Sequence, residues 1–284
     1  MPVLLDALAE PVPIVLAPTG MVPTRAMTPH VPIQPAEIAA DVARAIEVGI
    51  TAVHLHARDT DGTPTWKRDI YADIISRIRE VAPDLVIAVS TSGRAWSDLD
   101  KRADVLSLTG DLKPDVASLT LSSMNFIDGP SVNAPETIRA LARIMKERGI
   151  TPELEVFDLG MLNFARVLRK EGLLVGVVPA NLFFGNIAGM QPTLIEMAAA
   201  TSSVPDDVMW CGAGIGVYQG ISQLLSVAAG GGVRVGLEDG IHFDRARTQL
   251  ATNVSLVERT HRMLELAGRR MMTPGEYRQK VLAQ

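Results

Sequence analysis

The chain has 284 residues, of which 47% are hydrophobic and 21% are charged, and its formal net charge is -5. This composition provides a sizeable core and excludes a largely disordered chain. The negative charge argues against a general nucleic-acid-binding protein, whose binding surface should be basic. Cys211 is the only cysteine, so no intramolecular disulfide can form, which suits a reducing cytoplasm. The first ten residues do not resemble a signal peptide, and no apolar run is long enough to span a membrane, so we expect a cytoplasmic protein.

Short apolar runs alternate with longer amphipathic segments along the whole chain. The expected strands are Pro13–Ala17, Ile50–His56, Leu85–Ser90, Val116–Thr120, Thr151–Phe157, a run between Leu173 and Phe184, Val208–Ala213 and Val233–Leu237. The expected helices are Pro35–Val48, Asp69–Val81, Asp98–Leu106, Glu136–Arg148, one ending at Lys170, Pro192–Ser202, Tyr218–Ala228 and one from about Asp244 to Leu266.

About eight β-α units with short connections predict a parallel sheet closed into a (β/α)8 TIM barrel. An open, doubly wound sheet is the alternative, but Pro18-Thr19-Gly20 after the first strand is not the glycine-rich dinucleotide motif. No proline- or serine-rich linker divides the sequence. We therefore expect a single domain over residues 1–284, with a short C-terminal tail from about residue 269.

Two histidines close the second expected strand. Side chains alternate along a strand, so His54 and His56 should project from the same face. Two imidazoles side by side at the end of a buried strand indicate a metal site, because burying both without a function is unfavourable. The alternative is a pair of core histidines that bond to backbone carbonyl groups.

The last expected strand supplies the complement to this pair. Arg234 and Glu238 are four residues apart, so on a strand both side chains can point into the same end of the barrel. Asp239 follows Glu238 directly. Two histidines and one carboxylate form a common catalytic metal set that leaves positions open for substrate. Zinc is the first expectation, with iron or manganese as alternatives. The carboxylates next to Gly240 can also serve as a helix cap or turn device.

Functional residues of such barrels gather where strands end and the following loops begin. The remaining strand ends of this chain are polar: Thr19, Arg58, Ser90, Thr91, Ser92, Gly93, Arg94, Ser118, Thr120, Asn125, Glu155, Asn181 and Asn186. The glycines of Gly212–Gly216 follow the seventh strand and could let a phosphate or thioester approach the backbone.

Several motifs together resemble the β-keto acid cleavage enzymes, of which 3-keto-5-aminohexanoate cleavage enzyme is a member. The motifs are APTG (17–20), VHLHARD (53–59), VSTSG (89–93), KPDVASL (113–119), ELEVFDLGM (153–161), CGAGIG (211–216) and VRVGLEDG (233–240). The resemblance spans nearly the whole chain. It implies a zinc-dependent (β/α)8 enzyme that converts a β-keto acid and acetyl-CoA into acetoacetate and a new acyl-CoA, and it implies a homo-oligomer, either a tetramer or a dimer.

The resemblance also assigns residues by motif. It implies His54, His56 and Glu238 as metal ligands, and Asp239 as the acid-base residue held by Arg234. It further places four residues around the substrate, namely Ser90, Gly93, Ser118 and Thr120. The bound metal would act as a Lewis acid that stabilises an enolate, which then attacks the thioester.

Three departures from the family pattern concern the substrate. Val22 stands where aminohexanoate-type enzymes carry a Glu, the loop at 90–93 reads STSG followed by Arg94, and the EDN motif ends in Gly240. We infer that the distal substrate group is not cationic. It is neutral, or anionic if Arg94 or Arg25 turns inward; alternatively, Arg94 is a solvated loop residue.

Two other functions are open from sequence alone. A metal-dependent aldolase or hydrolase on the same barrel would share the metal site without consuming acetyl-CoA. A non-catalytic small-molecule binder would keep only the fold.

Overall fold

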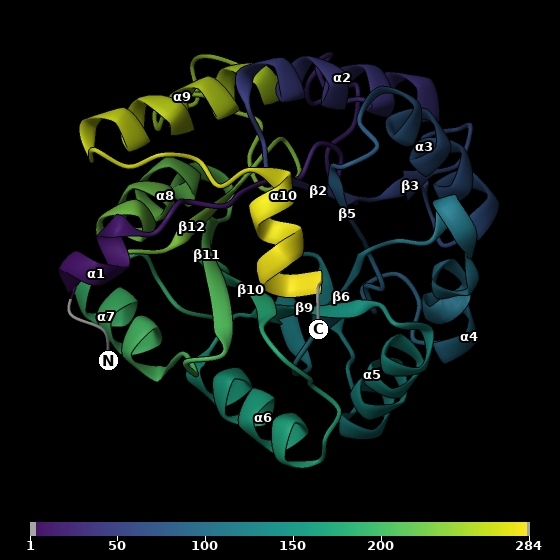
Figure 1. Ribbon diagram of the computed structural model, residues 1–284. Helices are drawn as coiled ribbons and strands as arrows, with labels where there is room; N and C mark the ends of the chain where they lie inside the picture. The colour runs from purple at the N-terminus through teal and green to yellow at the C-terminus, as the bar shows by residue number, and fades with distance from the viewer. Residues whose placement is uncertain (1–3, 283–284) are drawn as a thin grey trace.

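The computed structural model describes residues 4–282, and its centre is a closed ring of eight parallel strands surrounded by helices (Figure 1). The barrel strands are β1 (Ile14–Leu16), β2 (Ala52–Leu55), β5 (Val86–Val89), β6 (Val116–Thr120), β9 (Thr151–Val156), β10 (Val178–Phe184), β11 (Val208–Gly214) and β12 (Gly232–Val235). Each strand pairs with the next barrel strand along the chain, and β12 pairs with β1 to close the ring. The predicted (β/α)8 barrel is confirmed.

The helices that surround the barrel mostly begin and end close to the expected positions. They are α1 (Leu4–Ala9), α2 (Pro35–Val48), α3 (Arg68–Val81), α4 (Leu99–Ala103), α5 (Pro135–Arg148), α6 (Leu159–Lys170), α7 (Leu194–Ser203), α8 (Gln219–Ala228), α9 (Asn253–Leu266) and α10 (Pro274–Tyr277). Pro35 opens α2 where its missing N–H has no helical partner anyway. Gly49 ends it at φ 117°, and its N–H donates to the Ala45 carbonyl at 3.0 Å.

Inward side chains change character along the barrel axis. Near the amino ends of the strands they are small or apolar: Val15, Ala52, Val86, Ala88, Val116 and Cys211. Further along the strands the inward side chains are polar and buried: His54, Ser118, Glu153, Asn181 and Arg234. The sequence therefore places its buried polar groups towards the carboxyl ends of the strands, where the active sites of such barrels lie.

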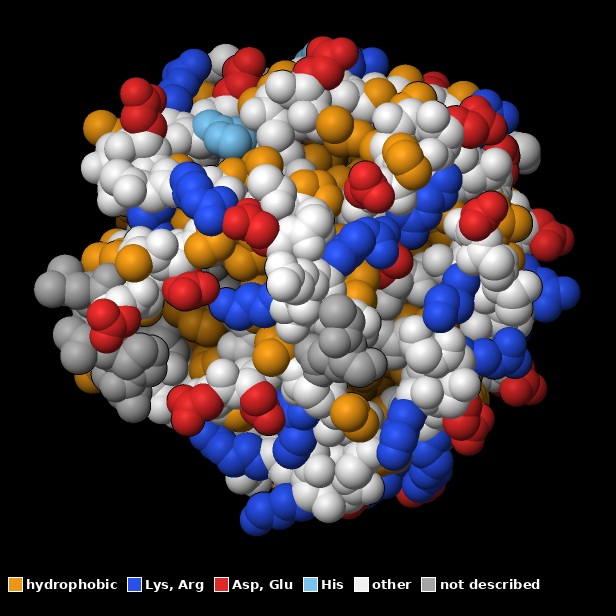
Figure 2. All heavy atoms as spheres, viewed as in Figure 1, with side chains coloured by type: hydrophobic (Ala, Val, Ile, Leu, Met, Phe, Trp, Pro, Cys, Tyr) orange, Lys and Arg blue, Asp and Glu red, His pale blue; other side chains and the backbone are white. Residues whose placement is uncertain are grey.

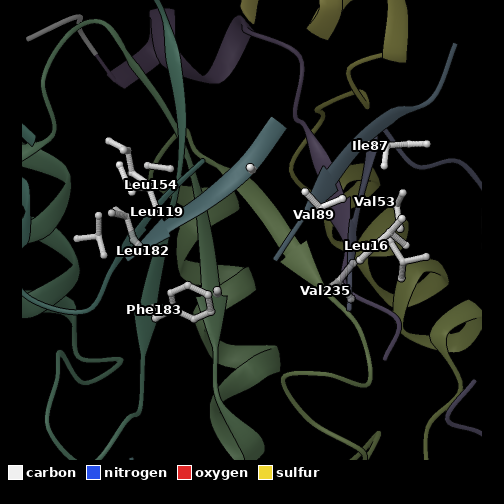
Figure 3. Packing of buried hydrophobic residues seen from close by; sticks show 14 of the residues in the cluster. Leu16, Val53, Ile87, Val89, Leu119, Leu154, Leu182, Phe183 and Val235 are labelled. Atoms are coloured by element: carbon white, nitrogen blue, oxygen red, sulfur yellow. The ribbon is translucent and has the colours of Figure 1, made fainter. Parts of the chain in front are cut away.

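The outward faces of the strands carry the main hydrophobic core. Leu16, Val53, Ile87 and Val235 come from four neighbouring strands and lie close together (Figure 3). All four are fully buried and face the ring of helices. This layer holds the helices against the barrel and leaves the interior free for polar groups.

The last long helix begins later than expected. The sequence predicts a start near Asp244, but α9 begins at Asn253, so that expectation is wrong. The Asp244 carboxylate accepts hydrogen bonds from the backbone N–H groups of Thr248 and Gln249, which folds this segment into a compact loop. Thr252 then caps α9, because its side chain accepts from the Ser255 N–H at 3.1 Å.

Small elements in the loops and at the N-terminus were not predicted. Two antiparallel pairs lie on the loops that leave β2 and β6: β3 (Ala57–Arg58) with β4 (Pro64–Thr65), and β7 (Met124–Phe126) with β8 (Gly129–Ser131). Strands of two or three residues are too short to show an alternation pattern in a sequence. Helix α1, which precedes β1, was also missed.

The expected C-terminal tail covers the amino-terminal end of the barrel. Met271 forms a parallel bridge with Val12, and α10 lies across the barrel opening in Figure 1. Met272, Tyr277 and Val281 pack on the lower apolar layer inside the ring. The opposite, carboxyl end of the barrel is therefore the end at which the interior can receive a ligand.

Figure 2 shows this covered face, on which acidic and basic side chains are interspersed. The face presents no uniformly basic surface of the kind that nucleic acids select. Within residues 4–282, no helix has the length and apolarity needed to cross a membrane.

We predict that Tyr277→Ala destabilises the fold by about 3–4 kcal/mol, because a large ring that is 1% exposed leaves a cavity at the base of the barrel. Urea unfolding followed by circular dichroism measures this change. Leu266→Ala is the matched control, since Leu266 is 91% exposed and its truncation should leave the free energy of unfolding nearly unchanged. Equal stability of the two variants would contradict this role for the C-terminal segment.

Candidate active site

The two histidines at the end of β2 face each other inside the barrel. The Nε2 atoms of His54 and His56 lie 3.3 Å apart, and both side chains are buried. Glu153 of β9 binds His54 from the other side, with Oε2 2.7 Å from Nδ1. A carboxylate at Nδ1 fixes the proton there, so the lone pair of Nε2 points towards His56. The prediction that His54 and His56 project from the same face of the strand is thus confirmed.

Glu238 completes a cluster with these histidines. Its Oε1 lies 3.1 Å from Nε2 of His56. One ligand atom from each of His54, His56 and Glu238 falls within a group whose members are all within 4.8 Å of one another. The other carboxylate oxygen of Glu238 is buried and has no hydrogen-bond partner among residues 4–282. An orphaned buried carboxylate oxygen beside two imidazoles is a place where a cation would satisfy unmade interactions.

The dimensions of this cluster fit a small divalent metal. Two imidazole nitrogens that each bind zinc at about 2.05 Å with tetrahedral angles lie about 3.3 Å apart. The observed separation of the two Nε2 atoms is 3.3 Å. The ionisation states also suit ligation. Burial lowers the pKa of His56. Although burial acts in the opposite direction, the charge of Arg234 lowers the pKa of Glu238. Burial and Arg234 also act to lower the pKa of His54, but Glu153 raises it on balance, which makes that ring more basic.

Arg234 on β12 connects the cluster to Asp239. Its side chain is 1% exposed, and its Nε donates to Asp239 Oδ2 at 2.9 Å. Its Nη2 lies 2.6 Å from Glu238 Oε1 and 3.3 Å from Asp239 Oδ1. The guanidinium also lies over the ring of Phe183, 5.0 Å from its centroid. Burial, opposed by the charge of Arg234, raises the pKa of Asp239 to about 6.

Two glycines let Glu238 approach the histidines. Gly236 has φ 152°, and a Cβ there would stand 2.0 Å from the Ala17 carbonyl oxygen. Gly20 has φ 66°, and a Cβ there would stand 2.4 Å from Cγ of Glu238. Any larger residue at either position would displace the loop after β12 or the one after β1.

A cavity of about 430 Å³ opens above the cluster at the carboxyl end of the strands. His56, Glu238 and Asp239 form part of its floor, and Ser90 and Arg94 form part of its wall. The remaining wall is largely apolar and includes Met21, Val22, Met27, Phe126, Ile127, Phe157 and Phe183. A small organic acid could therefore enter with its polar end at the cluster and its chain along apolar walls.

Three of the predicted substrate residues are not among those that line this cavity. Ser118 accepts a hydrogen bond from the Thr91 N–H at 3.0 Å, and Thr120 donates to Glu155, which does line the cavity. Gly93 lies against Arg102, whose Nη1 would be 2.7 Å from an added Cβ. These three residues therefore contact side chains and backbone groups of the loop and the wall, and do not line the cavity themselves.

The two arginines named for the distal substrate group lie in different places. Arg94 lines the cavity, stacks over Phe126 at 4.3 Å and has its Nη2 3.2 Å from Asp128. Arg25 pairs with Glu37 and is not among the residues that line the cavity.

Sequence reasoning missed Glu153 and the β7–β8 hairpin. Glu155 was chosen from β9, yet Glu153 has the same alternation parity and is the residue that binds His54. The Glu-Leu-Glu pattern was the available signal, since both carboxylates must point inward if one does. Phe126 and Asp128, which flank Arg94, come from the hairpin and had no such signal.

The fold and this cluster together define a TIM-barrel protein with a candidate metal centre at the carboxyl end of its strands. A family model described as beta-keto acid cleavage enzyme matches residues 11–282. The chain belongs to the beta-keto acid cleavage enzyme family.

Curated relatives resemble the chain over nearly its full length. A "3-keto-5-aminohexanoate cleavage enzyme" of Fusobacterium nucleatum is 34% identical over 270 residues, covering 94% of this chain and 96% of the relative. A "3-oxoadipate:acetyl-CoA acetyltransferase" of Cupriavidus necator is 34% identical over 275 residues, covering 95% and 94%. The solved apo structure of ObcA has the same fold, with a TM-score of 0.76 at 21% identity; the match covers 90% of this chain and 66% of ObcA.

We predict that Arg234→Leu destabilises the chelator-treated protein by about 3–5 kcal/mol at pH 7, because it leaves the buried Asp239 carboxylate and the largely buried Glu238 carboxylate without their cation. Urea unfolding measures the effect. Arg77→Leu is the control, because its pair with Asp73 is exposed and contributes little. An Arg234→Leu variant as stable as the control would show that the carboxylates do not need this guanidinium.

Proposed function

We propose that this protein is a metal-dependent β-keto acid cleavage enzyme, which converts a β-keto acid and acetyl-CoA into acetoacetate and a new acyl-CoA. Family membership supports the reaction class, and relatives named as transferases that use acetyl-CoA support the second substrate. The observation that carries the proposal is the arrangement of His54, His56 and Glu238 next to the Arg234–Asp239 pair.

The buried charges support a divalent cation at the cluster. The carboxylates of Glu153 and Asp239 are buried and that of Glu238 is largely buried, and Arg234 is the cation that contacts both Glu238 and Asp239. One oxygen of Glu238 still has no hydrogen-bond partner within residues 4–282. A divalent ion held by His54, His56 and Glu238 would supply that partner, and zinc fits the imidazole spacing. When bound, the metal would supply Lewis-acid stabilisation of the negative charge that develops on the substrate's keto oxygen.

Asp239 is the proposed acid-base residue. It lines the cavity, and its pKa of about 6 leaves it mostly ionised near neutral pH yet able to carry a proton. It removes a proton from the carbon between the keto and carboxylate groups, and that carbon attacks the acetyl-CoA carbonyl, releasing the CoA thiolate. The thiolate then attacks the original keto carbon, the carbon–carbon bond breaks, and acetoacetate leaves after its carbanion takes the proton back from Asp239.

Arg234 has the positioning role in this scheme. Its two contacts to Asp239 hold the carboxylate in one orientation, and its contact to Glu238 keeps that ligand ionised. Ser90 and Arg94 are the predicted substrate residues that line the cavity, so we propose direct substrate contact for these two. We propose that Gly93, Ser118 and Thr120 support them from behind. The homo-oligomeric state and the cytoplasmic location stay predictions from the sequence.

We predict that chelation abolishes acetoacetate formation and that Zn²⁺ restores it. His54→Ala should lose both bound metal and turnover, whereas Asp239→Asn should keep the metal and lower kcat by about 10²–10⁴-fold, the usual contribution of acid-base catalysis. Metal analysis and an acetoacetate assay with and without acetyl-CoA provide the measurements.

The same assay separates this proposal from its rivals. Turnover that does not need acetyl-CoA would indicate an aldolase or hydrolase, and a metal-free protein without turnover would indicate a binder. Unimpaired turnover of Asp239→Asn would remove that residue from its proposed role.

We further propose that the distal substrate group is anionic or neutral. Val22 and Arg94 line the cavity, so an aliphatic group and a cation are available to the distal end of a substrate, and Val22 offers no carboxylate to a substrate ammonium. Asp128 and Glu155 line the cavity too, but Asp128 is exposed and pairs with Arg94, and Glu155 accepts a hydrogen bond from Thr120.

A panel of β-keto acids of matched length with a terminal carboxylate, methyl or ammonium group tests this. We predict that Arg94→Met lowers kcat/KM for the dicarboxylic substrate about 10- to 100-fold, the contribution of one charged hydrogen bond, and changes that for the methyl substrate little. Arg25→Met is the matched control. Preference of the wild-type protein for the ammonium substrate would refute the proposal.

A further inference from the structure

Helix α8 packs on the barrel with polar rather than apolar side chains. Gln219, Ser222, Gln223 and Ser226 lie on its inner face and are at most 3% exposed, whereas Ile221 and Leu224 on other faces are 43% and 48% exposed. Burying four polar side chains of one helix gains little hydrophobic free energy. Helix α8 is therefore held on the barrel in large part by the hydrogen bonds of these side chains.

The two glutamines bind the backbone around the Glu238–Asp239 turn. Gln219 Nε2 donates to the Gly236 carbonyl at 3.0 Å and to the Gly240 carbonyl at 3.5 Å, one on each side of the two acids. Gln223 Nε2 donates to the carbonyl of Arg234 at 3.0 Å. These bonds replace the ladder of hydrogen bonds that ends with β12 at Val235.

Asn253, the first residue of α9, binds the same turn from the other side. Its Oδ1 accepts from the Leu237 N–H at 2.9 Å, and its Nδ2 donates to the Pro18 carbonyl at 3.0 Å. Nδ2 also donates to Asp41 of α2. Asn253 is 0% exposed, so this one carboxamide joins the loop after β1 to the loop after β12 inside the protein.

We propose that Gln219 and Asn253 are positioning residues that fix the 236–240 turn, and thereby set both the cation affinity of Glu238 and the placement of Asp239. The proposal rests on the function proposed above. Gly236 and Gly240 give the backbone of this turn wide conformational freedom. Neither Glu238 nor Asp239 lies on a regular strand that would restrict it. Sites of this kind lose activity when a group moves by about 1 Å, so amides that hold the turn influence the chemistry without touching substrate.

Ser226 supplies a matched control on the same helix. Its hydroxyl donates to the Gly232 carbonyl at 2.6 Å and accepts from the Gly212 N–H at 3.0 Å, at the opposite end of β12 from the turn. It is as buried as Asn253 and also binds two backbone groups. A residue that matters only for folding should behave like Ser226.

The experiment compares Gln219→Met, Asn253→Ala and Ser226→Ala in the full-length protein. The Kd for Zn²⁺ is measured by competition with a chromophoric chelator, kcat at saturating Zn²⁺ by acetoacetate formation, and Tm by calorimetry. We expect the first two variants to weaken Zn²⁺ binding about tenfold or more and to lower kcat more than they change KM, as substitutions behind metal ligands do. We expect Ser226→Ala to lower Tm while its Kd for Zn²⁺ and its kcat stay at wild-type values.

Gln219→Met keeps the length of the side chain, so this variant carries the test even if Asn253→Ala does not fold. The inference is overturned if wild-type protein binds Zn²⁺ and the folded variants bind it equally well with unchanged kcat. Failure of the proposed function looks different, because wild-type protein itself would then bind no Zn²⁺, and both proposals would fall together.

Discussion

The buried guanidinium of Arg234 is the interaction on which the carboxyl half of the barrel depends. It contacts Glu238 and Asp239 at once, and its charge also acts on His54 and Glu153. Without a nearby cation, carboxylates inside a barrel would become protonated or repel one another. With the guanidinium in place, Glu238 remains anionic beside two imidazoles, and Asp239 titrates close to neutral pH. Burial and the charge of Arg234 together leave two adjacent acids with different pKa values, lowered for Glu238 and raised for Asp239.

Much of this arrangement follows from alternation and could be predicted from the sequence. His54 with His56, and Arg234 with Glu238, were placed on common faces by counting two residues along a strand, and the structure brings both pairs to one cluster. The β-α alternation predicted the closed barrel for the same reason: regular patterns repeat over many residues. The prediction was weakest where a single side chain overrides a pattern, as Asp244 does when it folds the segment before α9 into a loop.

Other parts of the site carry no local signal. The choice between Glu153 and Glu155 as the partner of His54 depends on how far each strand is shifted along the barrel, which no single strand reveals. The role of α8 is also hidden, because its inward face is polar and its exposed positions include Ile221 and Leu224. A hydrophobic pattern assigns such a helix the wrong face. Its orientation is decided by backbone groups of β12 that need partners, and these are known only once the tertiary fold is known.

The closure of the ring has a consequence for the order of biosynthesis. His54 and His56 are synthesised well before β12, Glu238 and the segment that bridges Val12. The ring closes only when β12 pairs with β1, so the nascent chain exposes two imidazoles and an unpaired strand edge until β12 has been made. A cation captured by that partial chain would have only two of its three protein ligands. The three side chains of the candidate metal site therefore come together only at the step that closes the two open edges of the barrel sheet.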